Sequence, residues 1–249
     1  MTSAVTEASP RPEPDAPEQP ILVATGVCKT YRTGSVAVEA LRGIDLTIRS
    51  GEFLAVMGPS GNGKTTMLNC LSGLDDIDGG TVLVDGEDIH AMSDKRRTEH
   101  RAHRMGFIFQ SFNLIPVFTA EENVELPLLL IGAAARDSRR RARAMLDRVG
   151  LADRHHHRPT ELSGGEQQRV AVARALVSEP AIVWGDEPTG NLDSTNAAEM
   201  LELLGEVNRS GQTLVVVTHD ATIASRAERL VRVTDGRVTA DGRPADLLA

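Results

Sequence analysis

The sequence predicts an α/β fold: a doubly wound, mainly parallel sheet with helices on both faces. Three short runs of consecutive apolar residues carry this prediction. They span residues 53–57, 181–184 and 214–217. Because these runs do not alternate polar with apolar side chains, they are typical of central parallel strands that are covered on both faces. The segments between the runs show helical periodicity, so strands and helices are expected to alternate along the chain.

Helix and turn signals support this arrangement. One apolar helical face comprises Met145, Leu146 and Val149, and a second comprises Met200, Leu203, Leu204 and Val207. Gly150 follows the first face and Ser210-Gly211 follows the second, as helix stops. Asp-Gly pairs at 85–86 and 235–236 lie between β-type runs and predict hairpin turns. The predicted fold class is therefore α/β with antiparallel β additions.

Composition and charge exclude several classes of function. The 249 residues are 41% hydrophobic and carry a net charge of −8. This acidic balance argues against a phosphate-backbone binder, and the 3% aromatic content argues against base stacking, so we expect no nucleic-acid partner. The two cysteines suit a reducing cytosol. Since the chain lacks an apolar run of about 18 residues and a signal-peptide pattern, we expect a cytoplasmic protein whose membrane role comes through a partner.

The chain divides into a tail and a domain. Residues 1–20 contain five prolines among acidic and small residues. This composition cannot bury a core, so we expect a disordered, proline-rich tail. Residues 21–249 are expected to form the domain.

A glycine-rich loop follows the first apolar strand. Residues 58–65, GPSGNGKT, fit the phosphate-binding pattern G-x-x-x-x-G-K-[ST]. They lie between the 53–57 strand and a predicted helix over 65–72, which is the context that the motif requires. The glycines let backbone N–H groups wrap phosphates. We expect Lys64 to reach the β- and γ-phosphates and the Thr65 hydroxyl to ligate Mg²⁺.

Polar residues follow the other two apolar strands. Asp186 and Glu187 come after the second strand, and His219 comes just after the third. Because the carboxyl ends of parallel strands meet at one edge of a sheet, these side chains are expected to join the phosphate loop. Asp186 suits the magnesium shell. Glu187 is the candidate that handles the attacking water, either as base or by orienting it, and His219 is expected to hold it in register.

A second anion-binding feature lies in the stretch ELSGGEQQR. Ser163 and Glu166 form an S-x-x-E capping box before a helical segment that runs toward Ser178. A capped helix does not require Gly164-Gly165, because glycine weakens a helix by about 1 kcal/mol relative to alanine. The pair is explained if a ligand approaches the backbone closely. Since the first loop already wraps one set of phosphates, this helix start is free to face a γ-phosphate held by another chain.

Together, these motifs resemble those of the ATP-binding-cassette ATPases, from Leu22 to the C-terminus. The resemblance implies a P-loop NTPase with a RecA-like sheet that binds ATP and Mg²⁺. Its ATP-binding residues would be Tyr31, Gly58, Pro59, Ser60, Gly61, Asn62, Gly63, Lys64, Thr65, Thr66 and Gln110. Its Mg²⁺ ligands would be Thr65, Gln110 and Asp186, and its catalytic residues Glu187, His219 and Lys64. We therefore expect a competent ATPase.

The resemblance also implies a dimer. In that family two cassettes dock head to tail, and each ATP lies between one chain's phosphate loop and the other chain's signature. The signature here would be Ser163, Gly164, Gly165 and Glu166, and the D-loop residue Asp193. A second cassette, an identical chain, is therefore the expected partner. Asn62 lies where a small residue such as serine is usual, and we expect little effect because both residues are polar and tolerate turns. Trp184-Gly185 departs from the usual aliphatic residue and alanine, which puts local packing in doubt but not the acidic pair.

The segment GFIFQSFNLIPVFTAEENVELPL, residues 106–128, is similar to one branch of the family. The branch comprises macrolide exporters, lipoprotein-releasing transporters and the cell-division cassette. The resemblance implies a helical subdomain over roughly 112–178 and a groove for an integral membrane permease. The groove residues would be Phe112, Asn113, Leu114, Ile115 and Pro116. Alternatively, these residues simply pack the subdomain, and both can hold.

Three functions are compatible with this branch. The first is the ATPase subunit of a transporter that exports or extracts hydrophobic compounds, lipids, lipoproteins or peptides, held at the cytoplasmic face of the cell membrane by its permease. The second is a mechanical motor that regulates a cell-wall enzyme or sensor without transport. The third, a soluble cassette for a cytosolic assembly, is disfavoured by the resemblance to a coupling groove.

Three further features are expected to be structural. His155, His156 and His157 precede Pro159 in an expected exposed loop, without a nearby carboxylate to complete a metal site. The basic run Arg136–Arg143 is expected to be a solvated helix face. Cys70 is expected to be a small buried apolar residue.

Overall fold

The computed structural model describes residues 20–34 and 36–248 of the chain. The predicted tail, residues 1–20, lies outside the described residues except for Pro20. Among the described residues, no helix is long and apolar enough to cross a bilayer.

A six-stranded sheet forms the centre of the fold, in the order β10-β9-β3-β8-β7-β6. Its strands are β3 (Phe53–Met57), β6 (Met105–Phe109), β7 (Ile182–Asp186), β8 (Thr213–Val217), β9 (Arg229–Thr234) and β10 (Arg237–Gly242). The first five strands pair in parallel, and β10 runs antiparallel beside β9. The three strands predicted from apolar runs are thereby confirmed as β3, β7 and β8.

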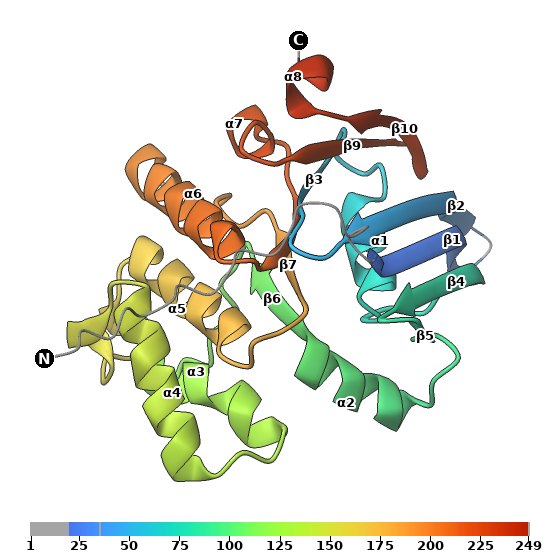
Figure 1. Ribbon diagram of the computed structural model, residues 1–249. Helices are drawn as coiled ribbons and strands as arrows, with labels where there is room; N and C mark the ends of the chain where they lie inside the picture. Colours follow the sequence, from blue (N-terminus) through green and yellow to red (C-terminus); the bar gives the residue numbers. More distant parts are fainter. Residues whose placement is uncertain (1–19, 35, 249) are drawn as a thin grey trace, which may run out of the picture.

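Both faces of this sheet are buried, as uninterrupted apolar strands require. Phe53 and Ala55 of β3 belong to the core shared with α3 (Ala120–Leu130), α4 (Ala135–Arg148), α5 (Gly164–Leu176) and α6 (Ser194–Arg209). Leu54 and Val56 belong to a second core that contains α1 (Lys64–Leu71) and a smaller sheet. Figure 1 shows α1 between the two sheets, and α3, α4, α5 and α6 on the opposite side of the central sheet.

The smaller sheet is antiparallel and has the order β2-β1-β4-β5. It comprises β1 (Pro20–Thr33), β2 (Val36–Arg49), β4 (Gly79–Val84) and β5 (Glu87–Asp88). Both predicted Asp-Gly hairpin turns are present, with positive φ at Asp85, Gly86, Asp235 and Gly236. Two consecutive residues with positive φ are typical of the type I′ turn, whose twist matches that of paired strands.

The remaining helices lie at the edges. They are α2 (Asp94–Arg104), α7 (Ala221–Ala224) and α8 (Pro244–Leu247), with 3₁₀ turns at Ala152–Arg154 and Pro159–Glu161. The helical stretches predicted to end at Gly150 and Ser210-Gly211 correspond to α4 and α6.

The basic run on α4 is not simply a solvated face. Nε of Arg143 donates to Oε2 of Glu121 at 2.8 Å, and Nε of Arg139 lies 3.2 Å from Oε1 of the same carboxylate. Glu121 is 5% exposed on α3. Since a buried carboxylate needs a partner, these two arginines fasten α4 to α3.

The histidine run also differs from expectation. Nε2 of His155 lies 2.8 Å from Oδ1 of Asp147 on α4, so the run has a carboxylate partner that the sequence did not indicate. Only 15% of the His155 side chain is exposed. This histidine anchors the segment that follows α4 instead of standing free in a loop.

Candidate nucleotide-binding site

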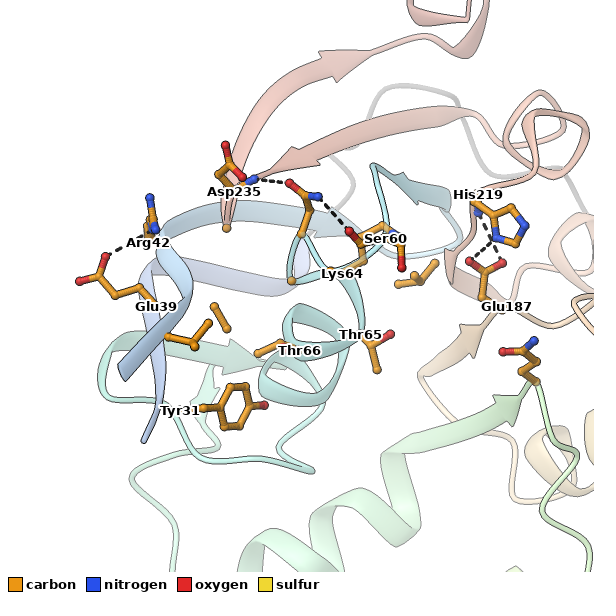
Figure 2. A pocket seen from close by; sticks show the side chains of 18 residues that line it. Tyr31, Glu39, Arg42, Ser60, Lys64, Thr65, Thr66, Glu187, His219 and Asp235 are labelled. Carbon is orange, nitrogen blue, oxygen red and sulfur yellow. Dashed lines mark hydrogen bonds and ion pairs between the residues drawn. The ribbon is translucent and has the colours of Figure 1, made fainter. Parts of the chain in front are cut away.

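A cavity of about 670 Å³ opens at the carboxyl ends of β3, β7 and β8 (Figure 2). Its walls come from the phosphate loop, the start of α1, strands β1 and β2, and the β9–β10 turn. Among the predicted site residues, those that line it are Tyr31, Ser60, Gly61, Asn62, Gly63, Lys64, Thr65, Thr66, Gln110, Glu187 and His219. Segments separated by nearly 190 residues of sequence therefore meet at one edge of the sheet, as the strand order predicts.

The phosphate loop follows β3 and leads directly into α1. Gly63 caps the helix in the left-handed region, with φ of 89°. A Cβ atom at this position would lie 2.4 Å from the Ala40 carbonyl oxygen on β2. Only glycine fits this turn and this close approach, so the loop is fixed against β2. Loops of this kind bind anions through their backbone N–H groups.

Lys64 lies over the loop that it belongs to. Its Nζ donates to the carbonyl oxygens of Gly58 at 2.8 Å and Pro59 at 2.9 Å. Only 9% of the surface of Lys64 is exposed to solvent. The ammonium group is thus already positioned within the loop. Phosphate oxygens bound by the loop would lie within reach of this charge.

Thr65 and Asp186 meet beside the loop. The Thr65 hydroxyl donates to Oδ1 of Asp186 at 3.1 Å. Burial raises the pKa of Asp186, and the neighbouring charge of Glu187 adds to that rise, whereas Thr65 and Lys64 oppose it. A hydroxyl and a buried carboxylate are hard oxygen ligands of the kind that Mg²⁺ prefers when phosphates complete its shell. The donor set therefore fits the metal.

Glu187 adjoins His219. Oε1 of Glu187 lies 2.8 Å from Nδ1 of His219, while Oε2 accepts from the hydroxyl of Thr218 at 3.2 Å. The backbone of Glu187 has φ of 48°, and its N–H donates to the Val217 carbonyl oxygen at 2.9 Å. Non-glycine residues in this conformation are uncommon and often functional. Sequence patterns gave no role to Thr218, which is fully buried; its position one residue before His219 is the available signal.

Gln110 and Asp193 lie at the ends of two connecting segments. Gln110 follows β6 and lines the cavity, and its carbonyl oxygen accepts from Nδ2 of Asn191 at 3.0 Å. Asp193 caps α6 by accepting from the N–H of Asn196 at 2.9 Å. That backbone hydrogen bond, with the Asn196 side chain, lowers the pKa of the Asp193 carboxyl. Asp193 therefore has a local role as a helix cap.

Tyr31 stands at the far end of the cavity from Glu187 (Figure 2). Its hydroxyl donates to Oδ2 of Asp75 at 2.7 Å, and Nζ of Lys29 lies 5.1 Å from the centre of its ring. Lys29 also donates to Oδ1 of Asp75 at 2.7 Å. The residue is 40% exposed. These contacts hold a rigid aromatic face at the cavity edge, which suits stacking on a base.

The Ser163 segment forms the predicted capping box at the start of α5. The hydroxyl of Ser163 accepts from the N–H of Glu166 at 3.2 Å, and Oε2 of Glu166 accepts from the N–H of Ser163 at 2.8 Å. The backbone bond to Ser163 and the bond from Arg154 lower the pKa of Glu166. Among the described residues that line the 670 Å³ cavity, none belongs to this segment.

The two glycines of this segment have different surroundings. A Cβ atom at Gly165 would lie 2.1 Å from Oδ1 of Asn196 on α6, so packing within the chain explains this glycine. A Cβ atom at Gly164 would meet only Phe112 at 3.9 Å and Leu192 at 4.0 Å, which is ordinary contact. The fold therefore requires Gly165 but not Gly164.

A second, more apolar cavity of about 370 Å³ lies between α2, β6, α3 and α5. Of the predicted groove residues, Asn113 lines it. The described lining does not include Phe112, Leu114, Ile115 or Pro116, and Leu114 packs against the main core. This placement agrees with the alternative that part of the segment packs the helices. The apolar walls come instead from residues such as Phe107, Phe109, Leu126, Pro127 and Leu130.

Trp184 is buried in the core and is not among the described residues that line the 670 Å³ cavity. It is 1% exposed and belongs to the core between the central sheet and α1. Two residues further along β7, Asp186 contacts Thr65 beside the phosphate loop. Among the described atoms, the indole Nε1 of Trp184 has no hydrogen-bond partner.

A phosphate loop after a central strand, with carboxylates and a histidine after its neighbours, defines a P-loop nucleotide hydrolase. Residues 41–190 match the protein family described as ABC transporter, and the chain belongs to this family. It is an ATP-binding cassette, the ATP-hydrolysing component of such systems. The predicted resemblance and fold class are confirmed.

Relatives of several kinds support this assignment. The chain is 49% identical to an uncharacterized ABC transporter ATP-binding protein of Thermotoga maritima, over 85% of this chain and 91% of the relative. It is 48% identical to the lipoprotein-releasing system ATP-binding protein LolD 1 of Rhodopseudomonas palustris, over 88% and 98%. It is 46% identical to the macrolide export ATP-binding/permease protein MacB of Brucella melitensis, over 92% of this chain but 35% of the relative.

Solved structures show the same fold. An ATP-binding cassette solved as a dimer in a post-hydrolysis state with ADP and Pi superposes with a TM-score of 0.83. It is 41% identical to this chain and covers 90% of it, and the match covers 98% of the solved chain. The chain spans about a third of the length of the macrolide export relatives, whose names include a permease.

Proposed function

We propose that this chain is the ATPase subunit of a complex that exports or extracts hydrophobic compounds, lipids, lipoproteins or peptides through a membrane permease. The observation that carries the proposal is the separation of two anion-binding features. The phosphate loop lines the cavity, whereas the exposed start of α5 carries a glycine at position 164 that the fold of one chain does not require. Two chains arranged head to tail complete two ATP sites.

The residues of the cavity divide the work of ATP hydrolysis. Tyr31 stacks on the base, and the loop N–H groups with Lys64 hold the phosphates. Thr65, Asp186 and Gln110 would hold Mg²⁺, which supplies charge neutralisation on the phosphates. Glu187 orients or deprotonates the attacking water, and His219 fixes the Glu187 carboxylate at 2.8 Å.

The second chain supplies the other half of each site. Ser163, Gly164, Gly165 and Glu166 approach the γ-phosphate held by the partner's loop, and the helix dipole of α5 favours that negative charge. Asp193 lies at the start of α6 near this face. ATP therefore forms much of the interface, and the nucleotide-free chain is expected to be largely monomeric.

The apolar cavity of about 370 Å³ is the proposed docking site for the permease. It lies beside Asn113, between the helices and β6, and β6 ends one residue before Gln110. Closure of the ATP site would thus reach the permease through Gln110 and the segment Phe112–Pro116. The domain spans residues 21–249 with a helical subdomain over roughly 112–178, and the permease holds it at the cytoplasmic face of the membrane.

The alternative is a motor that regulates a cell-wall enzyme or sensor without transport. A transporter and such a motor would use the same kind of ATPase chain, because they differ in the membrane partner.

The experiment is capture from solubilised membranes with Glu187→Gln as bait and ATP present. We expect recovery of a membrane protein with few spans and a large external domain. Recovery of soluble proteins alone would overturn the proposal in favour of a cytosolic assembly.

A further inference from the structure

The β9–β10 turn directs two backbone N–H groups at one residue of the phosphate loop. In a two-residue hairpin the flanking residues exchange the strand hydrogen bonds, which leaves the N–H groups of the two turn residues unpaired by the hairpin. Here the N–H of Asp235 donates to Oδ1 of Asn62 at 2.7 Å. The N–H of Gly236 donates to the carbonyl oxygen of Asn62 at 3.3 Å.

The Asn62 side chain also contacts its own loop. Its Nδ2 donates to the carbonyl oxygen of Ser60 at 3.2 Å, so the amide joins the loop to the turn. The orientation of the amide is fixed, since the Asp235 N–H can only donate and the Ser60 carbonyl can only accept. Both ends of the side chain are therefore matched to their partners.

The turn itself is held firmly against β2. The carbonyl oxygen of Gly236 accepts from the N–H of Arg42 at 2.8 Å. A Cβ atom at Gly236 would lie 2.5 Å from the Ala40 carbonyl oxygen, the same oxygen that closely approaches Gly63 in the phosphate loop. The turn is thus a rigid support for the loop and not a mobile hairpin tip.

We propose that Asn62 is a positioning residue that fastens the phosphate loop to the β9–β10 turn and thereby raises the affinity for ATP. The inference rests on the proposed role of the loop in ATP binding. Phosphates are bound by loop N–H groups and Lys64, whereas these contacts use the Asn62 side chain and carbonyl oxygen. The turn can therefore hold the loop in its binding shape before and after ATP enters, which lowers the ordering cost of binding.

A serine, the usual residue here in the family that the motifs resemble, cannot make the same link. Its hydroxyl is bonded directly to Cβ, so it reaches about 1 Å less far than Oδ1 of asparagine. A hydrogen bond of 2.7 Å would stretch beyond the hydrogen-bond range. Asparagine at position 62 therefore makes a link to the β9–β10 turn that a serine would not make.

The test is ATP affinity of the full chain by isothermal titration calorimetry, with Asn62→Ala, Asn62→Ser and the unaltered protein. We expect both variants to bind ATP about three- to tenfold more weakly, the effect of losing one or two hydrogen bonds. Lys64→Ala, which removes the charge that lies over the phosphate loop, is the control for ATP binding at this site. If the unaltered chain does not bind ATP, or binds no better than Lys64→Ala, the proposed function fails; if it does bind and both Asn62 variants match it, only this inference fails.

Amide hydrogen exchange at Asp235 tests the link itself. We expect exchange to accelerate about tenfold in Asn62→Ala and Asn62→Ser, because the acceptor is lost. Asn62→Asp keeps an acceptor of the same shape and should keep Asp235 protected, whatever its added charge does to phosphate binding. Unchanged exchange in all three variants would overturn the inference, and so would weaker ATP binding that follows only a fall in melting temperature.

Discussion

Nδ1 of His219 lies 2.8 Å from Oε1 of Glu187, although the two residues are 32 positions apart in the sequence. The parallel neighbours β7 and β8 end beside each other and bring them together. In the proposed function, this carboxylate at the edge of the cavity acts on the attacking water. The His219 side chain is 74% exposed, whereas that of Glu187 is 18% exposed.

Glu187→Gln is expected to lower ATP hydrolysis at least about a hundredfold, because the amide can neither accept the proton nor orient water as a carboxylate does. ATP binding should persist, since Lys64 and the loop are intact. The variant should form dimers with ATP, measured by light scattering, and Lys64→Ala should abolish them. Hydrolysis within twofold of the unaltered protein would exclude Glu187 as the group that handles water.

Thr218→Val is expected to slow ATP hydrolysis several-fold while ATP binding changes little. The buried hydroxyl donates to Oε2 of Glu187 at 3.2 Å, and valine keeps a similar shape but removes this donor, so that oxygen keeps only the longer bond from the His219 N–H at 3.4 Å. Thr218→Ser, which keeps the hydroxyl, is the matched control and should lose much less. Steady-state hydrolysis at saturating ATP makes the comparison. Equal losses in the two variants would point to packing in place of the hydrogen bond.

Much of the fold could be predicted because its central strands are short, apolar and followed by polar residues. The same pattern placed Asp186, Glu187 and His219 at one sheet edge with the phosphate loop. Contacts made by side chains from distant elements were not predictable. Glu121 shows this: nothing in its local sequence indicates that it is buried and paired with Arg139 and Arg143.

In the candidate site too, local features were predictable and contacts between distant residues were not. Periodicity and spacing revealed the phosphate loop and the capping box, which are local. They did not reveal that Asn62 binds the β9–β10 turn, since those residues are 173 positions apart. They also treated Gly164 and Gly165 alike, whereas Asn196 on α6 requires glycine only at position 165. Such distinctions depend on tertiary packing.

Cys70 is expected to resist thiol reagents in the native protein, whereas Cys28 should react. Burial, with the negative charge of Asp75, raises the pKa of the Cys70 thiol to about 12. At pH 8 only about one thiol in ten thousand would then be the reactive thiolate. Cys28 is half-buried. Labelling followed by mass spectrometry should find Cys28 modified first and Cys70 only on unfolding, with Cys28→Ser as control; equal rates would contradict the prediction.

Gly164→Ala and Gly165→Ala should separate folding from partner contact. Gly165→Ala is expected to lower the free energy of unfolding by about 1–3 kcal/mol, because its Cβ would overlap Asn196, whose side chain is held by Asp193.

Gly164→Ala should leave the stability of the nucleotide-free chain unchanged or slightly raised, because the Cβ has room and alanine favours a helix. The same substitution is expected to lower ATP-dependent dimerisation and hydrolysis at least about tenfold, since a methyl group would separate the helix start from the partner's γ-phosphate. Denaturant unfolding gives the stability, and light scattering with Glu187→Gln in the background gives the dimer. A stable Gly164→Ala chain that dimerises normally with ATP would show that this surface does not face nucleotide, and the head-to-tail arrangement would have to be abandoned.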